Sequence, residues 1–241
     1  MKIGILGAGP IGTTISKHLY NVGHDVKIAD VRSIDKLERK DFKGSAVTFD
    51  EAIQNIDVLI ISIPFNVVPT IKEKLSYLGE NTIIIDTTNY YPFRDGNIQA
   101  IEEGKVESVW VSEQIGRPVI KAFNNLLAMT LQNITSTDNK KIAMAISGDN
   151  QNHKDTVTKI INAIGIDVVD NGKLNNSWRH QPGAPAYCTE LDIEQLQRAL
   201  QIAEKTNIPL NRDEVINHFK PEMQHEDIVA MNRKVYGAEA L

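Results

Sequence analysis

A glycine-rich turn near the start of the chain constrains the fold more than any other feature of the sequence. The segment Gly7-Ala8-Gly9-Pro10-Ile11-Gly12 directly follows the apolar run Lys2–Leu6 and opens a stretch with apolar residues at helical spacing. A G-x-G-x-x-G turn between a strand and a helix is the context in which this motif binds the diphosphate of a dinucleotide. The first glycine permits the turn, the second admits the diphosphate, and the third lets helix and strand pack closely. The sequence therefore predicts a dinucleotide-binding βαβ unit.

Short β-branched runs alternate with helical patterns through residues 1–148. Several of these runs are apolar at every position, which is typical of strands in a parallel sheet with helices on both faces. The alternation predicts a Rossmann-type, doubly wound parallel sheet of the α/β class with right-handed crossovers. The predicted strands are Lys2–Leu6, Asp25–Ala29, Val58–Ile63, Thr82–Ile85, Val119–Phe123 and Ile142–Ile146, with a weaker one at Ala46–Phe49.

The pattern changes after Gly148. An amphipathic helix around Val157–Ile164 precedes a short strand at Asp167–Asp170, and the segment Asn175–Thr189 has no period of either kind. Two or three helices follow it. We therefore divide the chain into an NAD(P)-type dinucleotide-binding domain, residues 1–148, and a smaller C-terminal α/β domain with terminal helices, residues 149–241.

The composition excludes several classes of protein. The chain has 26 Lys and Arg against 31 Asp and Glu, a net charge of −5, and so lacks the cationic surface that holds nucleic acid or anionic lipid. Its single cysteine, Cys188, excludes a disulfide framework and a multi-thiolate metal site. No apolar run approaches the ~20 residues of a membrane span, and Met1-Lys2 leads straight into the first strand without a signal peptide. We expect a cytoplasmic protein with a small-molecule substrate or second cofactor, and no nucleic-acid or membrane partner.

Opposite charges stand together at the end of the second predicted strand. Asp30 lies where an acid accepts hydrogen bonds from the adenosine ribose and selects NAD. Arg32 and Lys36, one helical turn apart, are placed to hold the 2′-phosphate of NADP. An ionised Asp30 would repel that phosphate unless it turned away. The residues alone leave NADP and NAD open, and also an alternative in which the two cations are solvated surface charges.

Several segments together carry a resemblance to a known family. They are the glycine turn, the pair Arg32…Lys36, Ser62-Ile63-Pro64-Phe65, and Asp86-Thr87-Thr88-Asn89. With them the chain resembles the NADP-dependent oxidoreductases related to the enzyme that passes hydride between NADP and the 5-deazaflavin coenzyme F420. The N-terminal domain of that family is related to pyrroline-5-carboxylate reductase. A bacterial subgroup without an established substrate is similar through further segments, among them Asn89-Tyr90-Tyr91-Pro92, residues 121–125 and residues 179–183.

The resemblance implies a role for particular residues. It places Arg32 and Lys36 on the 2′-phosphate, which favours NADP over NAD, and it places Ile63, Pro64 and Val67 along the dinucleotide and nicotinamide. Two positions depart from the family pattern, since Val31 replaces a serine and Asp30 stands where a neutral residue is usual. The predicted cofactor-binding residues are Gly7, Ala8, Gly9, Pro10, Ile11, Gly12, Asp30, Val31, Arg32, Lys36, Ile63, Pro64, Val67 and Asn89.

The ligand of an open α/β sheet lies outside the carboxyl ends of its strands, which places residues 63–67, 88–91 and 123–125 around the nicotinamide. Hydride transfer to a flavin or deazaflavin needs no protein acid, because the cofactors carry the chemistry. In this interpretation Phe65, Tyr90 and Tyr91 form a flat wall for a planar acceptor. Ordinary packing is the alternative for these aromatic residues.

A small carbonyl substrate would instead need an acid near its oxygen. Lys121 with Asn124 and Asn125 forms K-x-x-N-N, which resembles the catalytic lysine motif of β-hydroxyacid dehydrogenases. The alternative function is therefore a dehydrogenase of a small hydroxy acid or imine that uses Lys121. That motif lies on a helix, however, whereas residues 119–123 are predicted as a strand, so a structural lysine is also expected. A dinucleotide sensor without turnover is the third hypothesis.

The C-terminal part offers weaker candidates. Arg179 and His180 lie in the aperiodic segment, which suits a lid or an anion-binding rim, or else an ordinary surface pair. Glu222-x-x-His225 occurs once, whereas carboxylate-bridged metal sites need that motif twice, so we expect no metal. The candidate catalytic residues are Lys121, Asn125 and His180. Apolar residues on the last helices make a homodimer a further expectation; they are Phe219, Met223, Ile228, Met231 and Val235.

Overall fold

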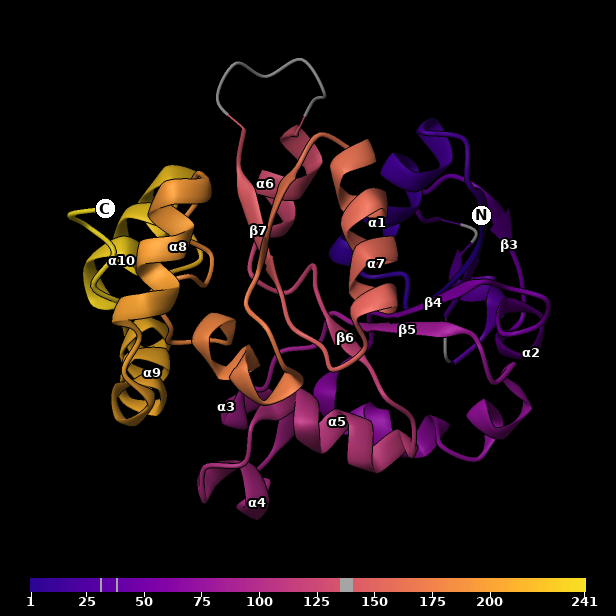
Figure 1. The fold of residues 1–241 in the computed structure, drawn as a ribbon, viewed down its shortest axis with the longest axis horizontal. Helices are drawn as coiled ribbons and strands as arrows, with labels where there is room; N and C mark the ends of the chain where they lie inside the picture. Colours follow the sequence, from indigo (N-terminus) through magenta and orange to yellow (C-terminus); the bar gives the residue numbers. More distant parts are fainter. Residues whose placement is uncertain (31, 38, 135–140) are drawn as a thin grey trace.

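The computed structural model describes residues 1–30, 32–37, 39–134 and 141–241 (Figure 1). Among these residues, a six-stranded sheet has the order β3-β2-β1-β4-β5-β6, and every pairing in it is parallel. This is the doubly wound order predicted from the sequence. The strands are β1 (Lys2–Leu6), β2 (Asp25–Ala29), β3 (Ser45–Ala46), β4 (Val58–Ile61), β5 (Ile83–Asp86) and β6 (Ile120–Lys121).

The register of the strands aligns their carboxyl ends at one edge of the sheet. Leu6 in β1 lies opposite Ala29 in β2 and Ile61 in β4. Ile61 in turn pairs with Asp86, and Asp86 pairs with Lys121. The turns that leave these strands therefore emerge side by side, which is where an open α/β sheet binds its ligand.

Helices cover both faces of the sheet, which explains why its strands are apolar at successive positions. Ile3, Ile5 and their neighbours pack against α1 (Pro10–Asn21), α6 (Ala128–Asn133) and α7 (Gln151–Ala163). Leu6, Leu59 and Ile61 belong to a second core on the opposite face, beneath α2 (Phe49–Ala52) and α5 (Glu107–Ile115). Two 3₁₀ segments, Phe65–Ile71 and Lys74–Tyr77, complete that face, and a single 3₁₀ turn, Ile34–Leu37, follows β2.

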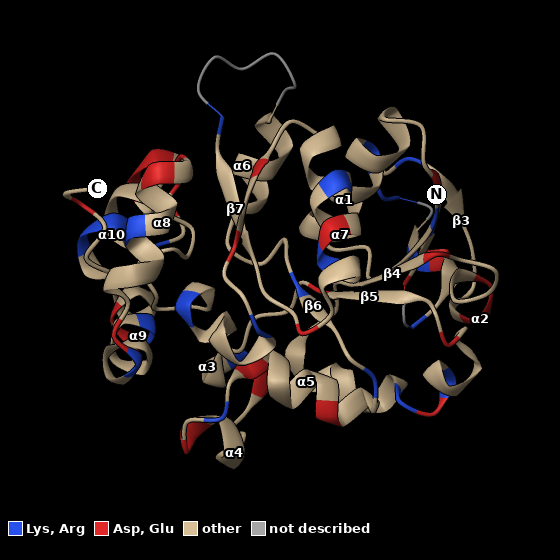
Figure 2. Ribbon diagram, viewed as in Figure 1, with Lys and Arg blue, Asp and Glu red and all other residues tan. Residues whose placement is uncertain are grey.

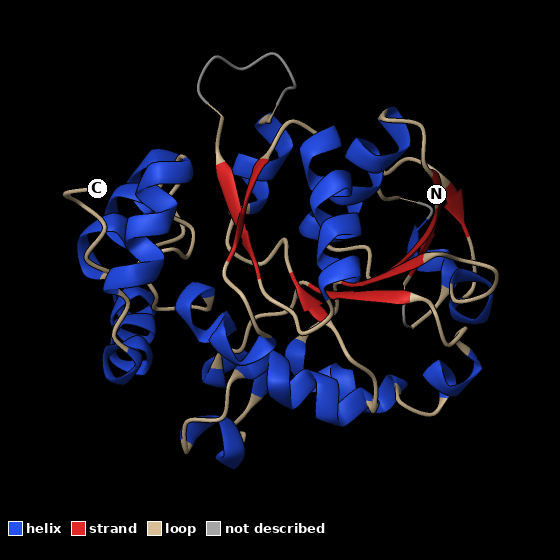
Figure 3. Cartoon of the chain, in the orientation of Figure 1, coloured by secondary structure: helices blue, strands red, loops and turns tan. Residues whose placement is uncertain are grey.

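A second, two-stranded sheet contains β7 (Ala143–Ile146) and β8 (Asp167–Asp170), which pair in parallel around α7 (Figure 3). The strand predicted at residues 142–146 thus lies in this small sheet and not in the large one, because Ala143 and Ala145 pack against α8 rather than beside β6. The two sheets meet at an antiparallel bridge between Lys121 and Ser147. The division of the chain at residue 148 stays a prediction.

The remaining elements lie beside α5 and β6 or, in the case of the C-terminal helices, at the end of the molecule away from the large sheet (Figure 1). Short helices α3 (Pro92–Asp95) and α4 (Gln99–Glu102) follow β5, and a 3₁₀ segment, Leu174–His180, follows β8. Then come α8 (Ile193–Ile202), the 3₁₀ turn Lys205–Asn207, α9 (Ile208–His218) and α10 (His225–Val235). Acidic and basic segments are interspersed over these helices (Figure 2). No helix of the described residues is both long and apolar enough to cross a membrane.

Candidate functional site

The glycine turn between β1 and α1 leaves space on one side only. A Cβ on Gly7 would lie 2.0 Å from the carbonyl oxygen of Ser62, and Gly7 has a φ of +112°, which side chains rarely adopt. A Cβ on Gly12 would lie 2.0 Å from the carbonyl oxygen of Gly7. At Gly9, in contrast, no described atom lies within 4 Å of the Cβ position. The turn therefore packs tightly through Gly7 and Gly12 and stays open at Gly9, next to the N–H groups that begin α1.

A cavity of about 610 Å³ lies over this turn, within the size range of small-molecule sites. Eight of the predicted cofactor residues line it: Gly7, Ala8, Gly9, Asp30, Arg32, Ile63, Pro64 and Val67. The open backbone at Gly9 and the cations at the rim fit a dinucleotide. Pro10, Ile11, Gly12, Lys36 and Asn89 are not among the described lining residues, and Val31 lies outside the described part of the chain.

The cavity has lining residues that the sequence reasoning missed. Lys36 lies exposed on the 3₁₀ turn after β2, and Lys40 reaches the cavity in its place. Lys36 misses the cavity for a local reason: the predicted pairing of Arg32 and Lys36 requires an α-helix, and the chain forms only a 3₁₀ turn there. Of the missed lining residues, only Phe49 had a local signal in the sequence, because the capping box of Thr48 and Glu51 starts α2 at Phe49. The missed residues are Lys40, Phe49, Ser62, Thr70, Ile71 and Lys74.

Asp30 and Arg32 form a bidentate ion pair at the rim of the cavity. Arg32 donates from Nε to Oδ1 and from Nη2 to Oδ2, both at 2.9 Å, and its backbone N–H donates to Oδ1 at 3.0 Å. These hydrogen bonds lower the pKa of Asp30. The Asp30 side chain is 7% exposed, whereas that of Arg32 is 70% exposed. The carboxylate is thus turned inward and compensated, while the guanidinium faces the cavity and solvent.

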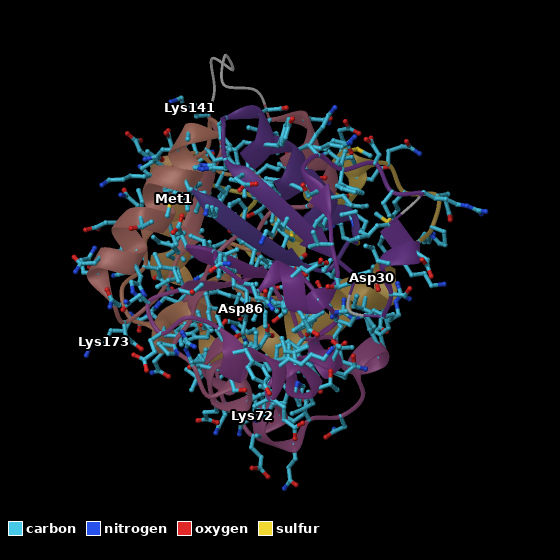
Figure 4. The ribbon with its side chains drawn as sticks, turned by 90° about the vertical axis from the view of Figure 1, so that its right-hand side faces the viewer. Met1, Asp30, Lys72, Asp86, Lys141 and Lys173 are labelled. Carbon is cyan, nitrogen blue, oxygen red and sulfur yellow. The ribbon has the colours of Figure 1, made fainter. Side chains whose placement is uncertain are left out.

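A second polar cluster is buried where β5 and β6 end (Figure 4 labels Asp86). Asp86 accepts hydrogen bonds from Thr88 Oγ1 at 2.7 Å, Ser108 Oγ at 2.6 Å and Lys121 Nζ at 3.1 Å. Lys121 also donates to the carbonyl oxygen of Thr88, and both charged side chains are buried. Lys121 lies on a strand, buried in an ion pair, which fits the interpretation as a structural lysine. Its catalytic use is disfavoured because it is fully buried and two of its three donors are bound to Asp86 and Thr88.

The segment after β6 departs from ordinary backbone geometry. Phe123 has a φ of +59°, which is rare for a bulky residue and is a form of strain common at functional sites. The turn directs Asn124 toward Asn89, whose Nδ2 donates to the backbone carbonyl of Asn124 at 3.1 Å and whose Oδ1 accepts from Asn124 Nδ2 at 3.2 Å. Asn125 donates to the carbonyl oxygen of Ala186 at 3.2 Å, and its buried Oδ1 has no partner among the described residues. Asn125 thus holds the aperiodic segment against the sheet edge.

His180 is fully buried, so it is not the surface partner of Arg179. Its Nδ1 lies 3.0 Å from Asn124 Oδ1, and its Nε2 lies 2.9 Å from Ser147 Oγ. Burial, and then the charge of Lys121, lower the pKa of His180 to about 3. His180 is therefore neutral at pH 7 and is not the imidazolium that general-acid catalysis would need.

The predicted aromatic wall is not present. Phe65 and Tyr90 are fully buried, and Phe65 stacks on Trp110 with the ring centroids 4.8 Å apart. Tyr90 donates its hydroxyl to the carbonyl oxygen of Gly96 at 3.0 Å. The interpretation as a platform for a planar acceptor was wrong for these two residues, because the apolar core beneath α5 takes both rings. The Tyr91 hydroxyl is 2.8 Å from that of Tyr187.

Other C-terminal candidates have structural roles. Arg179 stacks on Trp178 at 4.3 Å and donates to the carbonyl oxygen of Leu200 at 2.8 Å. Burial raises the pKa of Cys188 to about 12. His225 pairs with Glu190 at 2.6 Å and not with a carboxylate of its own helix. Within the described residues, no group of three or more His, Cys, Asp and Glu is placed to hold a metal ion.

Comparison with known proteins connects this geometry to a chemistry. Residues 2–90 match the family "NADP oxidoreductase coenzyme F420-dependent". The Escherichia coli protein YjhV is 29% identical over 98 residues, 39% of this chain and 72% of that protein. Glycerol-3-phosphate dehydrogenase of the NAD(P)+ type from a Thermoanaerobacter species is 31% identical over 99 residues, 35% of this chain and 30% of the enzyme.

A solved structure supports the fold. The hypothetical protein SMa0349 of Sinorhizobium meliloti superposes with a TM-score of 0.70 at 26% identity, covering 80% of this chain and 95% of that one. The likeness therefore extends beyond the glycine turn into the second half of the chain.

Proposed function

We propose, from the match of residues 2–90 to the family of coenzyme F420-dependent NADP oxidoreductases, that this NAD(P)-dependent oxidoreductase transfers hydride between NADP(H) and a flavin-like, planar acceptor. A flavin and a deazaflavin such as coenzyme F420 are the acceptor classes that this proposal names. The cofactor and the acceptor are each supported by a different part of the site.

The preference for NADP is supported by the charge around the cavity. Arg32, Lys40 and Lys74 line it, and the one acidic group among its described lining residues, Asp30, is compensated by its bidentate pair with Arg32. The 2′-phosphate of NADP carries a charge near −2 at neutral pH and accepts charge-assisted hydrogen bonds from such groups. The ribose hydroxyls of NAD would instead need Asp30 as a free acceptor. The ion pair of Asp30 and Arg32 is the observation that carries the proposal.

The remaining residues orient the ligand and exclude water. Gly9 admits the diphosphate, and Ile63, Pro64 and Val67 supply an apolar surface toward the nicotinamide end. When bound, the nicotinamide supplies or accepts the hydride. Lys121 is buried in its pair with Asp86 and His180 is neutral, which disfavours both as the acid that would protonate a carbonyl oxygen. An acceptor that needs no protein acid therefore fits the site better than a small hydroxy acid or imine.

The proposal is tested first by calorimetric titration with NADPH and NADH. We expect the wild type to prefer NADPH by about tenfold or more, which corresponds to about 1.4 kcal/mol. Lys40→Ala should reduce that preference. Lys36→Ala is its matched control, because Lys36 is a nearby exposed lysine outside the cavity lining. An equal affinity for both dinucleotides would contradict the assignment of NADP.

The acceptor is then tested by NADPH oxidation in the presence of flavin mononucleotide, deazaflavin F420, small 2-oxo acids and cyclic imines. Turnover with a flavin or deazaflavin alone is the expected result. Turnover with an oxo acid or imine that is lost in Lys121→Met, while NADPH still binds, would replace the proposal with the dehydrogenase alternative.

A further inference from the structure

A chain of hydrogen bonds, buried at its centre and part-buried at both ends, crosses from the small sheet to the edge of the large one through His180. It runs from Asn171 to Ser147, from Ser147 to His180, and from His180 to Asn124 and Asn89, with separations of 2.9–3.2 Å between the side chains. The backbone carbonyls of His180, Asn176 and Asn124 contact this series of hydrogen bonds. They determine which atom donates at each link, since a carbonyl oxygen only accepts.

The orientation of the Asn124 amide follows first. Its Nδ2 lies 2.7 Å from the carbonyl oxygen of His180, so that atom must be the nitrogen. Asn124 Oδ1 therefore faces His180 Nδ1, and His180 Nδ1 must carry the proton. In a neutral imidazole, Nε2 is then an acceptor, and the Ser147 hydroxyl donates to it. Asn171 Nδ2 is identified in the same way by the carbonyl oxygen of Asn176 at 2.9 Å, and it donates to Ser147.

The chain of donors ends at Asn89. Asn89 Oδ1 accepts from Asn124 Nδ2 at 3.2 Å, and Asn89 Nδ2 donates one hydrogen to the Asn124 carbonyl at 3.1 Å. The second hydrogen of Asn89 Nδ2 has no acceptor among the residues that the structure describes. Both links to Asn124 keep the amide from flipping, so this end of the chain always presents an N–H and never an oxygen.

The register of the sheet places this N–H beside the dinucleotide cavity. Ile61 pairs with Asp86, and Thr87 N donates to the Ile61 carbonyl at 3.1 Å. Ser62–Pro64 and Thr87–Asn89 therefore leave adjacent strands at the same edge, and the first of these segments lines the cavity. Asn89 is half-buried at that edge, next to the lining segment although not itself among the described lining residues.

We infer that His180 is a positioning residue that acts through Asn124, and that the Asn89 amide it orients donates a hydrogen bond to a neutral carbonyl oxygen at the nicotinamide end of the site. The inference rests on the proposed function. Two molecules carry such an oxygen: the carboxamide of the nicotinamide and a ring carbonyl of a flavin-like acceptor. A fixed N–H favours either of them over a donor group, because a donor facing it would be left without an acceptor.

The orientation itself is tested without any ligand. In protein labelled with ¹⁵N-histidine, His180 should give the signal of the Nδ1–H tautomer and should not titrate near neutral pH. The chain has six histidines, and the signal is assigned by its loss in His180→Asn. An Nε2–H tautomer, or a titration near pH 6.5 as in an unperturbed histidine, would overturn the inference.

The donor is tested with thio-NADP, in which sulfur replaces the carboxamide oxygen and accepts hydrogen bonds poorly. The wild type should bind NADP about threefold to tenfold more tightly than thio-NADP, the effect of one neutral hydrogen bond. Asn89→Ala and His180→Gln should abolish this difference. His180→Asn should retain it, because its amide nitrogen occupies the position of Nδ1 and still donates to Asn124. The affinity for 2′,5′-ADP, which lacks the nicotinamide, should be unchanged in all variants.

The acceptor is tested with riboflavin as the probe, bound to the NADP-loaded protein. If the carbonyl belongs to the acceptor, the wild type should bind NADP and thio-NADP equally. In that case riboflavin affinity should fall in Asn89→Ala and His180→Gln and should be retained in His180→Asn. The inference is wrong if neither probe follows that pattern, or if 2′,5′-ADP affinity falls together with NADP affinity. Asn89 is half-buried, so its variant decides the matter if His180→Gln fails to fold. Failure of 2′,5′-ADP to bind the wild type would contradict the proposed function, whereas the tautomer signal would still test the hydrogen-bond chain.

Discussion

Arg32 holds both carboxylate oxygens of Asp30 through its Nε and Nη2 atoms at 2.9 Å, and Asp30 in turn holds the guanidinium at the rim of the cavity. Taken separately, the two residues favour opposite cofactors, and their pairing supports the NADP preference that we propose. The carboxylate is compensated and turned inward, while the remaining guanidinium donors face outward. The pair therefore presents a cation where an isolated Asp30 would present an anion.

Arg32→Ala should exchange the cofactor preference of the protein. Loss of the guanidinium removes charge-assisted hydrogen bonds to the 2′-phosphate, so we expect NADPH affinity to fall by about tenfold to a hundredfold. The same change frees Asp30 to accept from the ribose hydroxyls, so NADH affinity should rise. Calorimetric titration of both dinucleotides measures the two effects. Equal losses for NADPH and NADH would contradict the role of the ion pair.

Gly9→Ala and Gly12→Ala should separate binding from folding. A Cβ at Gly9 meets no described atom, whereas one at Gly12 would lie 2.0 Å from the carbonyl oxygen of Gly7. We expect Gly12→Ala to lower the free energy of unfolding by about 1–3 kcal/mol through overpacking. Gly9→Ala should keep the wild-type stability and lose dinucleotide binding, because its methyl group occupies the diphosphate position. Urea unfolding and NADPH titration of both variants give the comparison.

Lys121→Met should destabilise the fold. The lysine is buried with Asp86, and removing one partner of a buried ion pair leaves an uncompensated charge at a cost of about 3–5 kcal/mol. Urea unfolding measures the loss. Adding Asp86→Asn to this variant should recover part of it, since the double variant has no buried charge at this position. A single variant of wild-type stability would show that the pair is not structural.

Glu107 should make stability depend on pH. It is buried in α5, and desolvation raises its pKa to about 7, against 4.5 in the unfolded chain. The raised value favours the protonated folded state, so the contribution of Glu107 is complete below pH 4.5 and is lost as the pH rises through about 7. Over this range the free energy of unfolding should fall by about 3 kcal/mol from this group.

The test compares Glu107→Gln with the wild type by urea unfolding between pH 4.5 and pH 8. The glutamine variant should lack that part of the pH dependence, because its amide does not ionise. Glu113→Gln is the matched control, since Glu113 is an exposed glutamate on the same helix. Parallel pH profiles for Glu107→Gln and the wild type would show that Glu107 titrates as an ordinary glutamate.

Much of the fold could be predicted because it depends on local patterns. The strands at Lys2–Leu6, Asp25–Ala29 and Asp167–Asp170 have the predicted bounds, since each is a short β-branched run between turns. The glycine turn was predictable for the same reason: its constraint acts within one βαβ unit. The partner of β7 was not predictable in this way, because strand pairing depends on contacts between segments distant in the sequence.

The candidate site shows the same distinction between features set by local sequence and features set by contacts between distant segments. The sequence by itself determined the dinucleotide turn, the apolar strand ends and the presence of opposite charges at Asp30 and Arg32, because these follow from residue type and short spacing. Only the tertiary structure decided that Arg32 compensates Asp30, that Lys40 and not Lys36 reaches the cavity, and that His180 joins Asn124 inside the protein. Burial and side-chain direction determine these outcomes, and both depend on which distant segments the packed core brings together.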